Sequence, residues 1–287
     1  MTRLVYRDYD QAALDAQYNL RAHVPEHPEY FRRWADASAE ARGRLDVHLD
    51  LAYGDDANET LDYFPAPGNA APILAFIHGG YWQALDKSDF TYLAPAWIER
   101  GVSFASINYP LAPDATIPAM IESCRSAVLW LWYNAYSLGA ERNRITVAGH
   151  SAGGHLATLI MSTDWAARGA LPSAMVKAGC SVSGVYDLEP IRLSYQNPVL
   201  KLDAATARAA SPIHLPPPRE KPLLLAVGGA ETPEFLRQQE TLAAAWSRGG
   251  QLECHLLEGL DHFAAVDCLA DTASPVFARL ERLIGPV

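Results

Sequence analysis

Ser151, Glu231 and His262 have the residue types that nucleophilic catalysis requires, in the chain order expected when the serine lies between a strand and a helix. Ser151 is the centre of a Gly-His-Ser-Ala-Gly sequence, with a short apolar run before it and a helix-like run after it. Between a strand and a helix, this G-x-S-x-G pattern forms a sharp turn that exposes the serine hydroxyl at the end of a sheet. We therefore predict that Ser151 is a nucleophile.

A serine hydroxyl attacks efficiently only when a base removes its proton and a further group orients that base. After a strand-turn-helix serine, the acid comes next in the chain and the histidine comes last. His262 follows the last predicted strand and is the predicted base, while Glu231 follows the penultimate strand and is the predicted acid. Three other carboxylates stay open as the acid, namely Asp187, Glu234 and Asp261. We expect a helix starting near residue 233 to turn Glu234 outward, and Asp261 to serve in a turn.

Gly79 and Gly80 follow an earlier predicted strand and are suited to binding an oxyanion. Glycines let backbone N–H groups turn towards developing negative charge, and the N–H after the nucleophile, here that of Ala152, completes such a site. Losing one such donor typically costs about 10²–10³ in kcat. We expect the neighbouring His78 to anchor the loop and to take no part in the chemistry.

The remaining pattern predicts an α/β fold that places these residues together. Apolar runs alternate with helical patterns after an initial hairpin at residues 45–51 and 60–64. This indicates a mostly parallel sheet of about eight strands with helices on both faces. The later strands are predicted at residues 73–77, 102–107, 145–148, 176–182, 223–227 and 252–257. Such sheets bind ligands beyond the carboxyl ends of their strands, where the glycine pair, the serine, the acid and the histidine all lie.

The whole chain, residues 1–287, is predicted to form one α/β domain. Residues 8–42 have a helical pattern, so we interpret residues 1–43 as a helical appendage that precedes the sheet. Residues 190–218 are irregular and contain a Pro-Pro-Pro run. We interpret this second segment as an insertion near the pocket.

Composition and motifs exclude several classes of protein. A formal net charge of -10 without a cluster of Lys or Arg argues against nucleic-acid binding. No zinc-protease, phosphate-loop or dinucleotide motif occurs, so we expect no metal and no cofactor. The cysteines lack C-x-x-C spacing and lie in apolar stretches, which predicts buried free thiols. These residues are Cys124, Cys180, Cys254 and Cys268.

The sequence predicts neither a signal peptide nor a membrane span. Its first residues carry early charges, and no apolar run approaches the roughly 18 residues needed to cross a bilayer. We expect a cytoplasmic protein that acts on a small-molecule substrate and has no membrane or nucleic-acid partner. A homodimer stays open.

Several segments resemble the α/β-hydrolase type of arylformamidase, also called kynurenine formamidase. Residues 78–82, His-Gly-Gly-Tyr-Trp, match the HGGxW signature of that family, and the sequence around Ser151 matches its nucleophile turn. The resemblance runs from about residue 70 to the C-terminus and includes residues 183–190, 196–198, 232–238 and 261–263. Generic esterases do not need several of these segments, so the resemblance points to this family in particular.

The resemblance implies hydrolysis of an N-formyl arylamine such as N-formylkynurenine, a step of tryptophan breakdown. It implies that Ser151 attacks the formyl carbonyl, that His262 protonates the departing arylamine nitrogen, and that water releases formate from the formyl-enzyme. A formyl group is small, so specificity must come from the pocket for the leaving group. Tyr81 and Trp82 are the expected aromatic walls of that pocket. For Trp82, packing beneath the glycine loop is an equal alternative.

One residue departs from the family pattern. The family usually has Asp directly before its Ser/Thr-Pro-Glu-Phe segment, where this sequence has Glu231. Glutamate orients a histidine as aspartate does, but its longer arm requires a different loop. Three rival hypotheses stay open: a broad-specificity carboxylesterase for short-chain acyl esters, an amidase or carbamate hydrolase, and a ligand-binding receptor on a hydrolase fold. The complete set of serine, acid and histidine weighs against the receptor.

Overall fold

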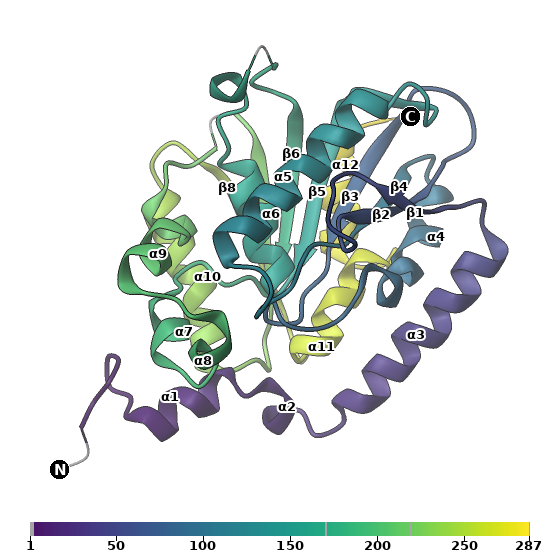
Figure 1. The fold of residues 1–287 in the computed structure, drawn as a ribbon. Helices are drawn as coiled ribbons and strands as arrows, with labels where there is room; N and C mark the ends of the chain where they lie inside the picture. Colours follow the sequence, from purple (N-terminus) through teal and green to yellow (C-terminus); the bar gives the residue numbers. More distant parts are fainter. Residues whose placement is uncertain (1–2, 170, 219, 287) are drawn as a thin grey trace.

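An eight-stranded sheet forms the centre of the protein in the computed structural model, which describes residues 3–169, 171–218 and 220–286 (Figure 1). The strands lie in the order β1-β2-β4-β3-β5-β6-β7-β8, and β2 alone runs against the others. This order confirms the predicted mostly parallel sheet. The strands are β1 (His48–Ala52), β2 (Thr60–Phe64), β3 (Ala71–Ile77), β4 (Ser103–Ile107), β5 (Ala140–His150), β6 (Val176–Val182), β7 (Pro222–Gly228) and β8 (Gln251–Leu257).

Helices cover both faces of the sheet, as predicted (Figure 1). The α-helices are α1 (Gln11–Tyr18), α2 (Leu20–His23), α3 (His27–Arg44), α4 (Ala94–Ile98), α5 (Ile117–Asn134), α6 (Ala152–Met161), α7 (Glu189–Leu193), α8 (Asn197–Leu200), α9 (Ala204–Ala209), α10 (Pro233–Trp246), α11 (His262–Ala265) and α12 (Pro275–Ile284). Short 3₁₀ segments are η1 (Lys87–Asp89), η2 (Thr91–Leu93), η3 (Ala166–Arg168), η4 (Pro212–His214) and η5 (Val266–Leu269). On one face α5 packs against α6, and on the other α4 meets α12, where the rings of Trp97 and Phe277 stack with centroids 4.3 Å apart.

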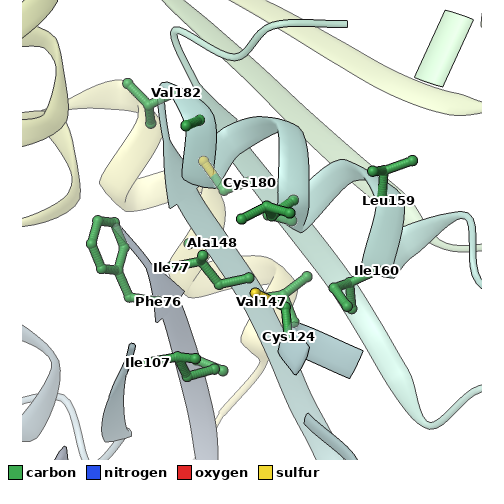
Figure 2. Packing of buried hydrophobic residues seen from close by; sticks show 14 of the residues in the cluster. Phe76, Ile77, Ile107, Cys124, Val147, Ala148, Leu159, Ile160, Cys180 and Val182 are labelled. Atoms are coloured by element: carbon green, nitrogen blue, oxygen red, sulfur yellow. The ribbon is translucent and has the colours of Figure 1, made fainter. Parts of the chain in front are cut away.

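The central strands are apolar on both faces because helices cover both faces. All residues of β3 and β4 are buried. Figure 2 shows Phe76 of β3, Val147 of β5 and Ile160 of α6 within this core. Burial of Cys124, Cys180 and Cys268 is confirmed, but the prediction for Cys254 is wrong. Cys254 lies on the edge strand β8, which leaves it exposed.

The register of the sheet brings the loops that follow β3, β5 and β6 to one place. Ile77, the last residue of β3, lies opposite Gly149 of β5. His150 in turn lies opposite Val182, the last residue of β6. Parallel strands in register end at the same edge of the sheet, so the residues that follow these strands emerge side by side.

Two glycines allow α6 to turn back closely on the sheet. A Cβ on Gly149 would lie 2.1 Å from the Gly153 carbonyl oxygen, and a Cβ on Gly153 would lie 2.0 Å from the Ile77 carbonyl oxygen. Neither neighbour is a flexible side chain, because both are backbone atoms. The first turn of α6 therefore rests directly on the end of β3.

The N-terminal helices pack against the body of the protein along the end where α11 lies (Figure 1). Helix α3 contacts η1 and η2, and its Trp34 is buried against Phe90 with ring centroids 5.2 Å apart. Helix α1 contacts α10 and α7, and its Leu14 and Tyr18 are fully buried. The segment predicted as an appendage thus contributes to the core and covers the carboxyl ends of the strands.

The helical segment between β3 and β4 begins with 3₁₀ turns. Its first half forms η1 and η2, and α4 begins only at Ala94, with Pro95 in its first turn. Proline has no N–H, so Pro95 cannot donate to the Thr91 carbonyl, which instead accepts from Ala94 in a tighter 3₁₀ turn. Helix α6 ends at Met161, and the segment predicted as an insertion contains the short helix α9.

Within the described ranges, no helix has both the length and the apolar character needed to cross a membrane.

The glycine contacts generate a matched pair of stability predictions. We expect Gly153→Ala to lower the free energy of unfolding and to reduce the yield of folded protein, because its Cβ would collide with the backbone of β3. A Cβ on Gly43, inside α3, meets no atom within 4 Å, so Gly43→Ala should stabilise the protein by about 0.5–1 kcal/mol through helix propensity. Urea unfolding of both variants measures the two effects. Equal stability of Gly153→Ala and the parent would contradict the close contact.

Candidate active site

Ser151 occupies a strained turn between β5 and α6. Its backbone has φ 56° and ψ -120°, and residues with a Cβ adopt such a positive φ only where the surrounding structure enforces it. The Ser151 N–H donates to the Val182 carbonyl at 2.8 Å, which fastens the turn to the end of β6. The structure thus places Ser151 in the strand-turn-helix setting expected from the sequence.

His262 and Glu231 form a buried hydrogen-bonded pair. Nδ1 of His262 lies 2.6 Å from Oε2 of Glu231, and both residues are almost fully buried. Because a carboxylate only accepts, Nδ1 carries the proton and Nε2 presents a lone pair. The pair therefore has the geometry of an oriented base.

The second oxygen of Glu231 also has donors. Oε1 accepts from the Ser183 hydroxyl at 2.5 Å and from the Gly228 N–H at 2.8 Å. These hydrogen bonds offset the desolvation of a buried carboxylate and fix the longer glutamate arm. Ser183 follows β6 and its N–H donates to Ala226 at 2.7 Å. Sequence reasoning did not assign Ser183, since nothing in its local pattern indicates a contact 48 residues away.

His150 supports the loop that carries His262. Its Nε2 lies 2.9 Å from the His262 carbonyl oxygen, and the two ring centroids are 4.7 Å apart. Burial, reinforced by the neighbouring His262, lowers the pKa of His150 well below its usual value. Since a carbonyl only accepts, neutral His150 donates from Nε2. It holds the loop without adding a positive charge beside the base.

Glu234, one of the alternative acids, lies away from His262. It is 1% exposed, accepts from the Tyr18 hydroxyl at 3.0 Å and pairs with Arg237 at 2.9 Å. The prediction that α10 turns Glu234 outward is wrong, because α1 covers this end of α10. Glu234 therefore fastens the N-terminal segment to α10.

The other two alternative acids also have separate partners. Asp187 accepts from the Tyr6 hydroxyl at 3.0 Å. Asp261 caps α11 by accepting from the N–H groups of Phe263 and Ala264, at 2.8 and 2.9 Å. The expected turn role of Asp261 matches this geometry. In the described parts of the chain, Glu231 is the carboxylate that contacts the imidazole of His262.

The glycine loop after β3 lies directly on Ser151. A Cβ on Gly79 would lie 3.0 Å from the Ser151 Cβ, and Gly80 adopts φ 103°, which favours glycine. Ala152 is the first residue of α6, so its N–H has no acceptor within the helix. The structure thus gathers the three residues predicted as oxyanion donors around the serine.

His78 anchors this loop through buried hydrogen bonds. Its Nε2 lies 3.0 Å from Oδ1 of Asn108, and its Nδ1 lies 2.8 Å from the Gly79 carbonyl oxygen. The ring of Tyr109 stacks on that of His78 with centroids 4.6 Å apart, and the Tyr109 hydroxyl donates to the His78 carbonyl. Burial lowers the pKa of His78. The neutral ring has one N–H, so it donates to one of these two oxygens and only contacts the other. The fully enclosed ring thus has the anchoring position expected from the sequence.

A cavity of about 460 Å³ opens in front of Ser151 and His262. A volume of this size suits a small aromatic ligand. The N-terminal segment supplies Asn19, Leu20, Arg21, Phe31 and Trp34 to its lining. Sequence reasoning missed these residues because helical periodicity shows which face of a helix is apolar but not which partner it meets.

The two predicted aromatic walls differ in position. Tyr81 lines the cavity, and its hydroxyl donates to the Tyr18 carbonyl at 2.8 Å. Trp82 is fully buried, does not line the cavity, and meets the edge of His155 at a centroid distance of 5.2 Å. Tyr81 and Trp82 both adopt a positive φ, of 51° and 59°, and the ring of Trp82 is buried in the core. The structure thus places Trp82 in the alternative position expected for it.

A chain of hydrogen bonds forms another wall of the cavity. The side-chain amide of Gln83 donates to Oε1 of Gln196 at 2.9 Å, and Nε2 of Gln196 donates to the Tyr195 hydroxyl at 3.0 Å. The Tyr195 hydroxyl in turn donates to the Tyr18 carbonyl at 3.2 Å. Tyr195 and Gln196 belong to the segment predicted as an insertion near the pocket, and the structure places both in the lining.

Among the described residues, no group of three or more His, Cys, Asp or Glu side chains is arranged to hold a metal ion.

The geometry agrees with the comparison to known proteins. The profile of the BD-FAE family matches residues 61–229, more than half of the chain. The kynurenine formamidase of Salmo salar is 32% identical over 87% of this chain and 86% of its own length. The kynurenine formamidase of Danio rerio is 30% identical over 93% of this chain and 89% of its own length. The chain belongs to the kynurenine formamidase family. It is therefore an arylformamidase- or esterase-like hydrolase.

Solved structures of other proteins have the same fold as this member of the kynurenine formamidase family. A thioesterase candidate from a Silicibacter species has 30% identity and a TM-score of 0.81, with 94% of this chain and 98% of that chain covered. Esterase B from Lactobacillus rhamnosis has 18% identity and a TM-score of 0.68, with 91% and 94% covered. Together with the sheet order, these likenesses show the α/β-hydrolase fold.

His155, which packs against Trp82, generates a prediction about acid stability. Burial lowers the pKa of His155 from 6.5 to about 4, so the folded protein resists a protonation that the unfolded chain undergoes. The free energy of unfolding therefore falls as the pH decreases from 6.5 to 4. Between pH 7 and pH 4, we expect the free energy of unfolding of His155→Gln to fall by about 3 kcal/mol less than that of the parent. Urea unfolding at pH 7 and pH 4 measures it, and an unchanged difference between the two pH values would contradict the prediction.

Proposed function

We propose that this chain hydrolyses the formamide bond of N-formylkynurenine or a related N-formyl arylamine through a formyl-enzyme on Ser151. The observation that carries the proposal is the buried Glu231–His262 pair, whose imidazole lines the same cavity as Ser151. The similarity to kynurenine formamidases over most of the chain supports this substrate class.

The first step is acylation of the serine. Nε2 of His262 takes the proton of Ser151 Oγ as Oγ bonds to the formyl carbon. The carbonyl electrons move to oxygen, and the N–H groups of Gly79, Gly80 and Ala152 stabilise that oxyanion. The tetrahedral intermediate collapses when the imidazolium protonates the arylamine nitrogen, which breaks the C–N bond and leaves the formyl ester.

The second step returns the enzyme to its starting state. Water fills the place of the arylamine, loses a proton to Nε2 of His262 and attacks the formyl ester. The tetrahedral intermediate expels Ser151 Oγ, which regains the proton from His262, and formate leaves. Glu231 keeps Nδ1 protonated and stabilises the imidazolium in both steps, while Ser183 and Gly228 hold its carboxylate in place.

The roles of Ser151 and Glu231 generate a kinetic prediction. We expect Ser151→Ala to abolish deformylation and Glu231→Gln to reduce kcat about 10³–10⁴-fold, because an amide no longer fixes the imidazole tautomer. Steady-state rates of formate release measure both effects. Glu40→Gln, an exposed carboxylate on α3, is the control and should retain the parent rate. Full activity of Glu231→Gln would remove Glu231 from the mechanism.

A second candidate is hydrolysis of short-chain esters by the same residues. Esterase LipQ of Mycobacterium tuberculosis is 34% identical over 64% of this chain and 44% of its own length. The similarity to a thioesterase candidate among the solved structures also favours hydrolysis of an ester. Both reactions use the same attack on a carbonyl, so the cavity for the leaving group decides between them.

Substrate competition separates the two candidates. We expect kcat/KM for N-formylkynurenine to exceed that for p-nitrophenyl acetate, because the larger leaving group makes more contacts in a cavity of about 460 Å³ than p-nitrophenol does. Side-by-side steady-state kinetics provide the comparison, with Ser151→Ala as the blank for spontaneous ester hydrolysis. Ester turnover without deformylation would make the second candidate correct.

A further inference from the structure

A positive charge lies in the wall of the cavity. Among the described residues that line it, Arg21 is the single Lys or Arg, and none is Asp or Glu. The sequence as a whole has a formal net charge of -10, so a lining without carboxylates contrasts with the composition of the chain. A cavity of this kind favours an anionic ligand over a neutral ligand of the same shape.

The backbone around Arg21 is fixed beside the cavity. The carbonyl of Tyr18 accepts from the hydroxyls of Tyr81 and Tyr195, at 2.8 and 3.2 Å. Leu20 is 4% exposed, so the residue directly before Arg21 is anchored in the core. Arg21 is thus held at the cavity although its own side chain is exposed.

The guanidinium of Arg21 is free to bind a ligand. Its Cζ lies 5.7 Å from the centroid of the Phe31 ring, which also lines the cavity. In the described part of the chain, no carboxylate lies within 4 Å of this guanidinium. By contrast, Arg237 and Arg33 both hold carboxylates of the protein.

We propose that Arg21 binds a carboxylate on the leaving group and thereby sets the preference of the enzyme for arylamides that carry a carboxylate. This inference rests on the proposed function, in which the formyl group is small and the cavity receives the arylamine. The planar guanidinium presents paired N–H donors that match the two oxygens of a carboxylate. N-formylkynurenine carries such a carboxylate on the side chain of its ring, whereas short-chain esters of neutral alcohols lack one.

The test compares a leaving group that carries a carboxylate with one that lacks it. N-formylkynurenine and its carboxamide share the aryl ring and the α-ammonium group and differ in the carboxylate, so the ratio of their kcat/KM values reports carboxylate recognition. We expect Arg21→Gln to lower this ratio about ten-fold or more, mainly through KM, and Arg21→Lys to retain part of it. Arg32→Gln, an exposed arginine of α3 outside the cavity, is the matched control and should leave the ratio unchanged. An equal loss on both substrates, or an unchanged ratio in Arg21→Gln, would overturn the proposal.

A binding measurement keeps this test separate from the proposed function. If the enzyme hydrolyses p-nitrophenyl acetate but no formamide, kynurenine and its carboxamide are compared as competitive inhibitors of ester hydrolysis. Kynurenine inhibition weakened about ten-fold in Arg21→Gln, with unchanged carboxamide inhibition, supports Arg21 and rejects the deformylase function. Equal inhibition constants for both compounds in the parent enzyme reject the role of Arg21.

Discussion

The close contact between the end of β3 and the first turn of α6 is the constraint on which the site depends. At this contact Gly153 lies against backbone carbonyls of β3, which leaves no room for a side chain. The contact holds the glycine loop, residues 78–80, against Ser151. The parallel register places the loops that follow β6 and β7 beside Ser151 as well. Because protein interiors are close-packed, a shift of any one of these loops displaces the others.

Two buried carboxylates near the site, Glu231 and Glu234, have different roles because different groups donate hydrogen bonds to them. Glu231 receives donors from Ser183, Gly228 and His262, which leaves it beside the imidazole. Glu234, only three residues later, is neutralised by Arg237 and a tyrosine hydroxyl. Burying two uncompensated carboxylates so close together would be costly, and separate partners remove that cost. One carboxylate is thereby kept for the histidine while the other holds the N-terminal helices.

The sheet and the Glu231–His262 pairing could be predicted from the sequence because both follow from local patterns at strand ends. The cavity could not be predicted in the same way. Arg21 and Phe31 reach it through packing between distant segments, and a helical pattern contains no information about such a partner. The position of Trp82 depends on a backbone φ of 59°, which residue type does not indicate. Cys254 is exposed because β8 lies at the edge of the sheet. The apolar residues next to Cys254 in the sequence do not reveal which strand lies at the edge.

The hydrogen bond from Tyr30 to Asp261 joins residues 231 positions apart in the chain. Synthesis on the ribosome proceeds from the N-terminus, so α1 emerges long before α10, on which it rests, whereas α3 meets η1 and η2 soon after its own synthesis. Until α10 is made, Tyr18, buried in the finished protein, lacks its partners Glu234 and Phe235. The ligand cavity therefore closes only after almost the entire chain has left the ribosome, because a nascent chain that ends before α11 has neither His262 nor Phe263, whose ring packs against Tyr30 and Phe31 of α3.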